Sequence, residues 1–194
     1  MLSQLRPAIL LFVILSLITG VIYPLAITGV AQIAFPHEAN GSIVVNRDGG
    51  AVGSSLIGQE FSTGEPKETA RWFWGRLSAT GPVPYSALNL QKAMGSSGSN
   101  LATTNPALIA NVNARLAGLA AADAAAGIIR PEAQSIPIDL VTSSASGLDP
   151  HISIVAAEYQ VARVANSRGM SEQTVRSLVA KHTSGRTFGV LGEP

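Results

Sequence analysis

The segment from Ser143 to Ser153 holds the residue types that hydrolytic chemistry uses most often. It reads Ser-Ser-Ala-Ser-Gly-Leu-Asp-Pro-His-Ile-Ser, so one of the chain's three histidines follows an aspartate by two positions. A serine nucleophile needs a base such as histidine within hydrogen-bond reach, and a third group must orient that base. Ser146, Asp149 and His151 are therefore a candidate Ser-His-Asp set for a hydrolase.

A structural interpretation of this segment competes with the hydrolase, and the sequence favours it. Asp149 and His151 are separated only by Pro150, so a rigid turn would have to aim both side chains correctly. The G-x-S-x-G elbow of α/β hydrolases occurs nowhere in the chain. Asp-Pro is a common turn signal, and Ser153 is a good N-cap for a following helix.

Other kinds of reactive site have less support. The run from Gly95 to Asn100 lacks the G-x-x-x-x-G-K-[ST] pattern with its lysine, so we expect a plain loop there and not a phosphate-binding loop. The chain has no cysteine, which excludes disulfides, thiolate zinc sites and cysteine nucleophiles. His37, His151 and His182 lack metal-ligand spacing, so we expect no metal in this chain.

Both tryptophans lie in the run Trp72-Phe73-Trp74-Gly75-Arg76. One interpretation is an aromatic cluster that closes a small core, with Arg76 stacked on a ring. The other is an anchor for a partner protein, because Trp and Arg are enriched at binding hot spots. The core interpretation is slightly favoured, and the contact interpretation stays open.

Several helices and short strands are predicted to position these residues. Residues 41–46 and 51–57 predict a hairpin, because Asp-Gly and Gly-Gly between them supply positive φ. Asn105 and Pro106 begin a helix that runs to Gly127. Helices are also expected from 154 to 168 and after Ser171, and residues 137–142 look like a strand or extended segment.

The fold class expected from these elements is α+β, with short strands and three to four helices after an N-terminal transmembrane helix. The apolar positions expected to face inward are Leu108, Val112, Leu116, Leu119, Val155, Tyr159, Ala162, Val164 or Ala165, Val175, Leu178 and Val179.

No charged side chain occurs between Pro7 and Phe35. About 20 apolar residues cross a bilayer core, so residues 8–35 are long enough for a transmembrane anchor. Apolarity continues well past Gly20, beyond the about 7–15 residues of a cleaved signal peptide. Pro24 is expected to kink the helix or to separate the span from an interfacial turn.

The charges around this anchor predict its orientation. Arg6 and the terminal amine precede it, so the positive-inside rule places residues 1–7 in the cytoplasm and residues 36–194 in an extracytoplasmic domain at the plasma (inner) membrane. A net charge of +1 with scattered Lys and Arg argues against nucleic-acid binding.

A series of short segments, taken in order, resembles the C subunit of the Kdp potassium-transporting P-type ATPase over nearly the whole chain. These segments are Leu5–Ala8, Thr19–Pro24, Asn40–Ser42, Gly53-Ser54, Leu56–Gln59 with Phe61, Gly75-Arg76 with Ser78-Ala79, Gly98–Leu101, Asn105-Pro106, Leu140–Asp149 with Ile152, and Arg163–Ala165. Leu77 stands where the family usually has proline. Members also usually continue past Gly192-Glu193-Pro194 with a further apolar strand.

The resemblance implies an accessory, non-catalytic subunit of a high-affinity potassium uptake complex, needed for assembly and activity. Its implied partners are a P-type ATPase subunit, a channel-like pore subunit and membrane lipid. It is also implied to be a catalytic chaperone that raises the ATP affinity of the hydrolysing subunit, with ATP bound with or by that partner. A membrane-anchored hydrolase and a stand-alone periplasmic binding module remain as alternatives.

Three groups of site residues follow from the resemblance and the residue pattern. They are Ser143, Ser146, Gly147 and Asp149 for nucleotide binding; Gly20, Tyr23, Pro24 and Gly29 for helix packing, together with the small residue Ala26; and Trp72, Trp74, Arg76, Asn100 and His151 for partner contact. Direct nucleotide contact conflicts with the predicted orientation, because ATP is cytoplasmic and only the residues before the anchor would be there.

Overall fold

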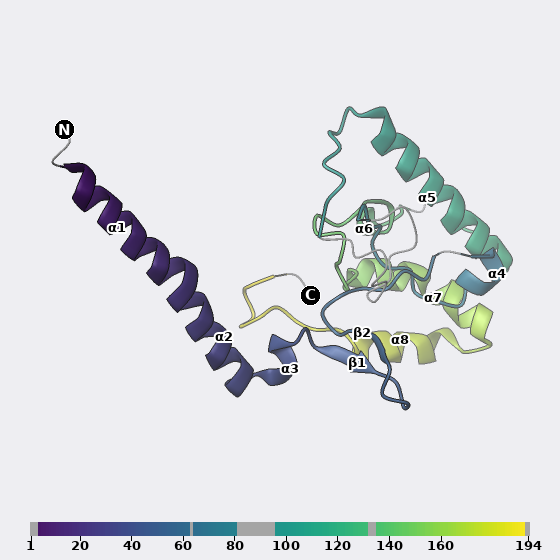
Figure 1. Cartoon of the computed structure of the whole chain (residues 1–194). Coiled ribbons are helices and arrows are strands. Elements are labelled where there is room, and N and C mark those ends of the chain that lie inside the picture. Colours follow the sequence, from purple (N-terminus) through teal and green to yellow (C-terminus); the bar gives the residue numbers. More distant parts are fainter. Residues whose placement is uncertain (1–3, 63, 81–95, 132–134, 193–194) are drawn as a thin grey trace. The chain divides into compact units, whose positions relative to one another are not determined.

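The structure, a computed structural model, describes residues 4–62, 64–80, 96–131 and 135–192. The chain forms two compact units, Met1–Ser54 and Ser55–Pro194, and each is treated by itself (Figure 1). The first contains an apolar helix and two short strands, and the regular elements described in the second are helices. The predicted α+β class is confirmed.

The N-terminal unit begins with one apolar helix from Leu5 to Ala34, which has a mean hydropathy of 2.5. It comprises α1 (Leu5–Leu17), a π-helical turn (Ile18–Ile22) and α2 (Tyr23–Ala34). None of these residues is buried within the chain. In length and composition the helix fits a single membrane span.

Pro24 does not end this helix. Its ring would clash with the carbonyl of Gly20, and it has no N–H to offer that carbonyl. The wider π-helical turn lies just before it, where the N–H of Tyr23 donates to the carbonyl of Ile18. The predicted disturbance therefore takes the form of a π-turn inside one continuous helix, a common response to a missing backbone bond.

A short helix and a hairpin complete this unit. Helix α3 (Pro36–Ala39) has Asn40 as its C-cap. The side-chain amide of Asn40 donates to that of Gln32 at 3.1 Å and accepts from it at 3.4 Å. Strands β1 (Ile43–Val45) and β2 (Ala51–Ser54) pair antiparallel. The Asn46 side chain accepts from the N–H groups of Asp48 and Gly50 and shapes the turn. The hairpin prediction is confirmed, although β2 ends at Ser54.

The second unit contains five described helices: α4 (Pro66–Thr69), α5 (Pro106–Ala125), α6 (Ile138–Val141), α7 (Ile154–Arg168) and α8 (Glu172–Lys181). The side chains of Asn105, Ser153 and Ser171 cap α5, α7 and α8, as their sequence positions predict. Gly169 ends α7 with φ of +64°, a left-handed conformation that glycine adopts without steric cost.

The strand or extended segment predicted at 137–142 is wrong, because Ile138–Val141 form a helical turn, α6. Pro137 lies just before it with φ of −56°, and its carbonyl accepts from the N–H of Leu140. The Asp139 carboxylate accepts from the N–H of Ser153 at 2.8 Å. Pro137 and this tertiary bond favour a single helical turn.

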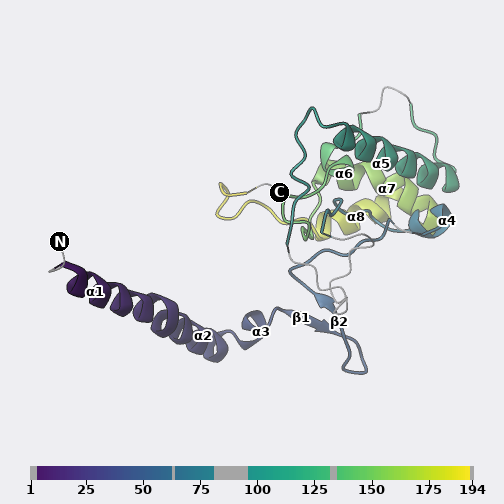
Figure 2. The same ribbon diagram turned by 45° about the horizontal axis from the view of Figure 1, so that its top comes forward.

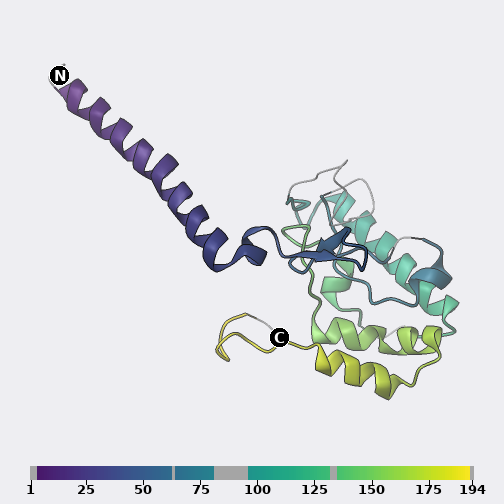
Figure 3. The same cartoon turned by 60° about the horizontal axis from the view of Figure 1, so that its bottom comes forward.

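Helix α7 lies between α5 and α8 (Figures 2 and 3). One core cluster contains Trp74, Leu119, Ala122, Leu140, Ala156 and Tyr159, and a second contains Val161, Val164, Ala165 and Val175. Two inward assignments are wrong, since Val155 is 67% exposed and Leu178 is also exposed. The buried face of α7 instead includes Gln160 and Arg163. Both are polar, so a search for apolar residues at helical spacing does not find them.

Candidate functional site

The segment Ser143–Asp149 is the site with the greatest sequence interest, and three other segments hold it. The N–H of Ser144 donates to the carbonyl of Leu77, and the hydroxyl of Ser78 donates to the carbonyl of Gly147 at 2.7 Å. The N–H of Ser97 and the hydroxyl of Ser96 both donate to the carbonyl of Ser146. The N–H of Gly58 donates to the carbonyl of Leu148. This serine-rich loop is therefore a packing centre for chain segments far apart in sequence.

Three glycines allow these backbones to approach so closely. A Cβ at Gly98 would lie 2.8 Å from the carbonyl oxygen of Ala145, and one at Gly58 would lie 2.7 Å from that of Asp149. At Gly147, where φ is +69°, a Cβ would overlap Thr80 and lie 2.6 Å from the Ser97 carbonyl oxygen. Glycine is the only residue that fits these positions without movement of the backbone.

Asp149 belongs to a small polar cluster at the edge of this loop. Its Oδ2 lies 3.3 Å from Nη1 of Arg76, and its Oδ1 accepts from the N–H of His151 at 3.0 Å. Arg76 also donates to the Ser143 carbonyl. Arg76 was expected to stack on a ring, but it pairs with Asp149 and supports the loop.

Of the three candidate hydrolase residues, Asp149 and His151 lie close together. Nδ1 of His151 lies 3.7 Å from Asp149, and the His151 side chain is 86% exposed. The Ser146 hydroxyl accepts from the N–H of Leu148 at 3.1 Å. No hydrogen bond within the described ranges joins Ser146 to His151. A general base must lie within hydrogen-bond reach of its nucleophile, so His151 and Ser146 do not form a catalytic pair in this arrangement.

The same loop offers little to a phosphate group. Phosphate loops present free backbone N–H groups with a lysine nearby, whereas the N–H groups of Ser144 and Leu148 are bonded inside the chain. Thr80 and Ser97 fill the space against Gly147. Arg76 is the described cation that contacts the loop, and it is paired with Asp149. These residues fit a structural turn better than a nucleotide site.

Trp74 occupies the centre of the core, where it is 3% exposed. The guanidinium groups of Arg115 and Arg163 lie over its ring, 4.6 and 4.7 Å from the centroid. Its indole N–H donates to the carbonyl of Thr69 at 2.9 Å. The core interpretation of the tryptophan run thus holds for Trp74, which has no surface to offer a partner.

An ion network joins this core to the end of α5. The Asp123 carboxylate binds Arg130 through two hydrogen bonds and lies 3.7 Å from Nε of Arg163. Arg130 also lies over the Tyr159 ring, 3.7 Å from the centroid. Burial lowers the pKa of Arg163 to about 10, and Asp123 opposes that shift. Burial likewise raises the pKa of Tyr159.

Trp72 differs from Trp74 because it is 45% exposed. Its ring stacks on Phe61 with centroids 5.2 Å apart, and the Arg168 guanidinium lies over it at 4.6 Å. The Nε of Arg168 in turn donates to the carbonyl of Arg71. This Phe61–Trp72–Arg168 stack is a rigid aromatic feature at the surface, of the kind that anchors partner contacts.

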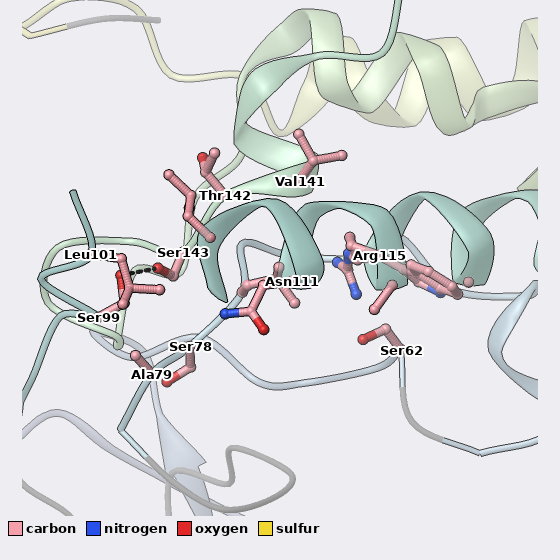
Figure 4. A pocket seen from close by; sticks show the side chains of 15 residues that line it. Ser62, Ser78, Ala79, Ser99, Leu101, Asn111, Arg115, Val141, Thr142 and Ser143 are labelled. Atoms are coloured by element: carbon pink, nitrogen blue, oxygen red, sulfur yellow. Dashed lines mark hydrogen bonds between the residues drawn. The ribbon is translucent and has the colours of Figure 1, made fainter. Parts of the chain in front are cut away.

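A pocket of about 420 Å³ lies between α5, α6 and the segments at 77–79 and 99–101 (Figure 4). Leu101, Leu108 and Val141 contribute apolar walls, and Ser62, Asn111 and Thr142 contribute polar groups. Arg115 lines it from α5. The predicted contact residue Asn100 is next in the chain to the pocket residue Ser99; it is exposed, and its amide donates to the carbonyl of Gly98.

The predicted packing residues of the anchor do not share one face. Tyr23 and Pro24 precede Gly29 by six and five residues in α2, and a helix turns by about 100° per residue. Gly29 therefore lies about 140° around the axis from Pro24, on the side that also carries Ala26. A Cβ at Gly20 or Gly29 would meet nothing within 4 Å, so both stand open to a neighbouring helix.

Sequence reasoning missed Arg115, Asp123, Gln160 and Arg163, which make the polar core around Trp74. The signal that could have found them is their place on otherwise apolar helix faces. Arg115 follows Leu108 by seven residues, and Arg163 follows Tyr159 by four, so each falls on an inward stripe. A charged residue in such a position indicates a buried partner.

Comparison with known sequences bears on the whole chain. Residues 5–194 match the family described as K+-transporting ATPase, c chain. The potassium-transporting ATPase KdpC subunit of Sorangium cellulosum (strain So ce56) is 53% identical over 195 residues, which cover 100% of this chain and 92% of the relative. Subunits of the same name from Dechloromonas aromatica (strain RCB) and Burkholderia mallei (strain SAVP1) are each 52% identical and cover 99% of this chain and 91% and 90% of their own lengths. The chain therefore belongs to the KdpC family of K+-transporting ATPase subunits.

Proposed function

We propose that this chain is a non-catalytic accessory subunit that holds a potassium uptake complex together from a domain outside the cytoplasm. The full-length family match is the observation that carries the proposal. Two further observations support it: the apolar 30-residue helix, which has no charged residue after Arg6, and a serine-rich loop whose polar groups bond within the chain. Its proposed partners are a P-type ATPase subunit and a channel-like pore subunit, with lipid around the remainder of the anchor.

The anchor is proposed to pack against partner helices through its small residues. Helices in lipid approach closely where glycine or alanine removes side-chain bulk. Gly29 and Ala26 lie on one side of α2, and Pro24 lies on another. Two distinct faces would let one helix touch two neighbours, as an assembly subunit requires.

The proposed effect on ATP is indirect. ATP is bound by the hydrolysing subunit, and this chain raises that affinity through contacts between subunits. A role for Ser143, Ser146, Gly147 and Asp149 in touching the nucleotide stays a prediction, and their bonds inside the chain give it no support. Because binding couplings are reciprocal, ATP should tighten the association of this chain with its partner by the same factor.

A pull-down tests the assembly role. The chain is tagged at its C-terminus and extracted in mild detergent from potassium-starved cells. We expect both the ATPase and the pore subunit to co-purify, with more recovered when a non-hydrolysable ATP analogue is present. The Gly29→Leu variant should lose the partner that packs on the Gly29 face, whereas Val30→Leu, which adds one methylene about 100° away, should keep both partners. Recovery of this chain alone, from membranes that contain the partners, would refute the proposal.

A labelling experiment tests the orientation. The chain has no native cysteine, so a single introduced thiol reports its own side of the membrane. Asp48→Cys places a thiol in the exposed hairpin turn, and Gln4→Cys places one before the anchor. In whole cells a membrane-impermeant maleimide should label Asp48→Cys and spare Gln4→Cys. The reverse pattern would place the domain in the cytoplasm.

A further inference from the structure

The pocket beside α5 contains a buried cation, Arg115, that has no neighbouring anion among the residues that the structure describes. Arg115 is 6% exposed, yet no carboxylate of the described part of the chain lies within 4.0 Å of its guanidinium. A buried charge is costly unless an opposite charge or hydrogen bonds compensate it.

Compensation from within the chain is only partial. Nε of Arg115 donates to the carbonyl of Leu140 at 2.9 Å, and one N–H of Nη2 donates to the carbonyl of Gly75 at 2.8 Å. A guanidinium has five N–H donors, and Nη1 has no acceptor among the residues that the structure describes. Burial lowers the pKa of Arg115, and the charge of Glu60 opposes this shift from a distance. The Glu60 carboxylate itself accepts from Ser62.

The pocket around this cation has the character of a small-molecule site. Its volume of about 420 Å³ falls in the range of known ligand pockets, roughly 300–1,000 Å³. Figure 4 shows Asn111 one turn before Arg115 on α5, with Ser62 on the segment below. Leu101, Leu108 and Val141 supply apolar walls on other sides. A cation and an amide beside apolar walls match a ligand with one charged end.

We propose that this pocket binds a small monocarboxylate with a compact apolar body. The carboxylate would accept hydrogen bonds from Arg115 and Asn111, and the body would pack against Leu108 and Val141. A planar guanidinium suits a carboxylate because it donates two parallel bonds to it. This proposal does not rest on the proposed assembly role, since it is argued from the residues that line the pocket alone.

Benzoate, with benzamide as its neutral isostere, tests the proposal on the full chain in mild detergent. In a Trp72→Phe background Trp74 is the sole indole, and it lines the pocket. Its fluorescence then reports occupancy directly. We expect saturable binding of benzoate and at least about tenfold weaker binding of benzamide, because hydrogen bonds to a charged group contribute about 1.5–3 kcal/mol.

Two matched variants separate this pocket from binding elsewhere. Ala114→Leu adds bulk to the pocket from α5 and retains Arg115, and Ala117→Leu makes the same change on the same helix outside the lining. Ala114→Leu should abolish benzoate binding, and Ala117→Leu should leave the dissociation constant within about twofold. Absence of binding to the parent chain, equal binding of benzamide, or benzoate binding that survives Ala114→Leu would each overturn the proposal.

Discussion

The side-chain amide of Gln160 forms hydrogen bonds with both the N–H and the C=O of Trp74, 86 residues earlier in the chain. Its Oε1 accepts from the Trp74 N–H at 2.7 Å, and its Nε2 donates to the Trp74 carbonyl at 3.1 Å. The residue is completely buried. A side-chain amide carries an acceptor oxygen and a donor nitrogen side by side, so it can satisfy the N–H and the C=O of one residue together.

Replacing Gln160 with leucine should therefore destabilise the domain strongly. Gln160→Leu leaves a buried N–H and a buried C=O without partners, at about 1–3 kcal/mol each. The measurement is urea unfolding of the detergent-solubilised chain, followed by tryptophan fluorescence. The matched control is Gln173→Leu on the exposed face of α8, which should change the free energy of unfolding by less than about 0.5 kcal/mol. Equal effects would show that the Gln160 amide contributes nothing specific.

Two glycines with nearly the same φ should respond very differently to alanine. Gly147 and Gly169 have φ of +69° and +64°, so both variants incur the left-handed penalty of about 1–2 kcal/mol. Only at Gly147 would the new methyl also collide with Thr80 and Ser97. Gly169→Ala should lose about 1 kcal/mol of stability, and Gly147→Ala should lose several or fail to accumulate. Similar losses in the two variants would mean that the loop around Gly147 is not tightly packed.

Alanine substitutions at His151 and Asp149 should have different effects on stability, because only Asp149 supports the loop. His151→Ala removes an exposed side chain and should leave both potassium uptake and stability unchanged. Asp149→Ala removes the partner of Arg76 and the acceptor for the His151 N–H, so it should lower the free energy of unfolding by about 1–3 kcal/mol. Loss of uptake in a stable His151→Ala variant would revive the hydrolase interpretation.

Local signals along the chain predicted much of this fold. The correct predictions depend on residues that are close in sequence. They are the apolar helix, the helix caps at Asn105, Ser153 and Ser171, and the end of α7 at Gly169. The segment at 137–142 was mistaken because its helical turn depends on a contact from Asp139 to Ser153. Propensity carries no information about such a contact.

The site was predicted less well for a related reason. Ser146, Asp149 and His151 have the residue types of a hydrolase site, and two of them, Asp149 and His151, lie close together. The loop's actual partners come from three distant segments, and the polar core around Trp74 joins α5 and α7 through Arg115 and Arg163. Pairings of this range cannot be read from the spacing of residues in one sequence.

The exposed stack on Trp72 should contribute to complex formation. Trp72→Ala removes an aromatic surface that Phe61 and Arg168 hold rigid, and it should reduce recovery of the partner subunits in a pull-down. The isolated chain should unfold at nearly the same urea concentration as before. Trp74→Ala is the contrasting change, since it should unfold the domain whether or not partners are present. Full recovery of partners with Trp72→Ala would remove this stack from the interface.

The buried Arg163 guanidinium should make stability depend on pH in the alkaline range, with a definite sign. Its pKa is about 10 in the folded chain and well above that in the unfolded chain, so below pH 10 both states hold the proton and its contribution is constant. Between these values the unfolded chain binds more protons, and stability rises with pH by up to about 1.4 kcal/mol per unit. Tyr159 acts in the opposite direction, and the charge of Arg163 lowers the pKa of Tyr159, so the comparison of the parent with an Arg163→Met variant is made in a Tyr159→Phe background. The free energy of unfolding of the parent minus that of the variant should be flat from pH 8 to 9 and increase above about 10. A difference that falls with pH would mean that the pKa of Arg163 is higher in the folded chain than in the unfolded chain.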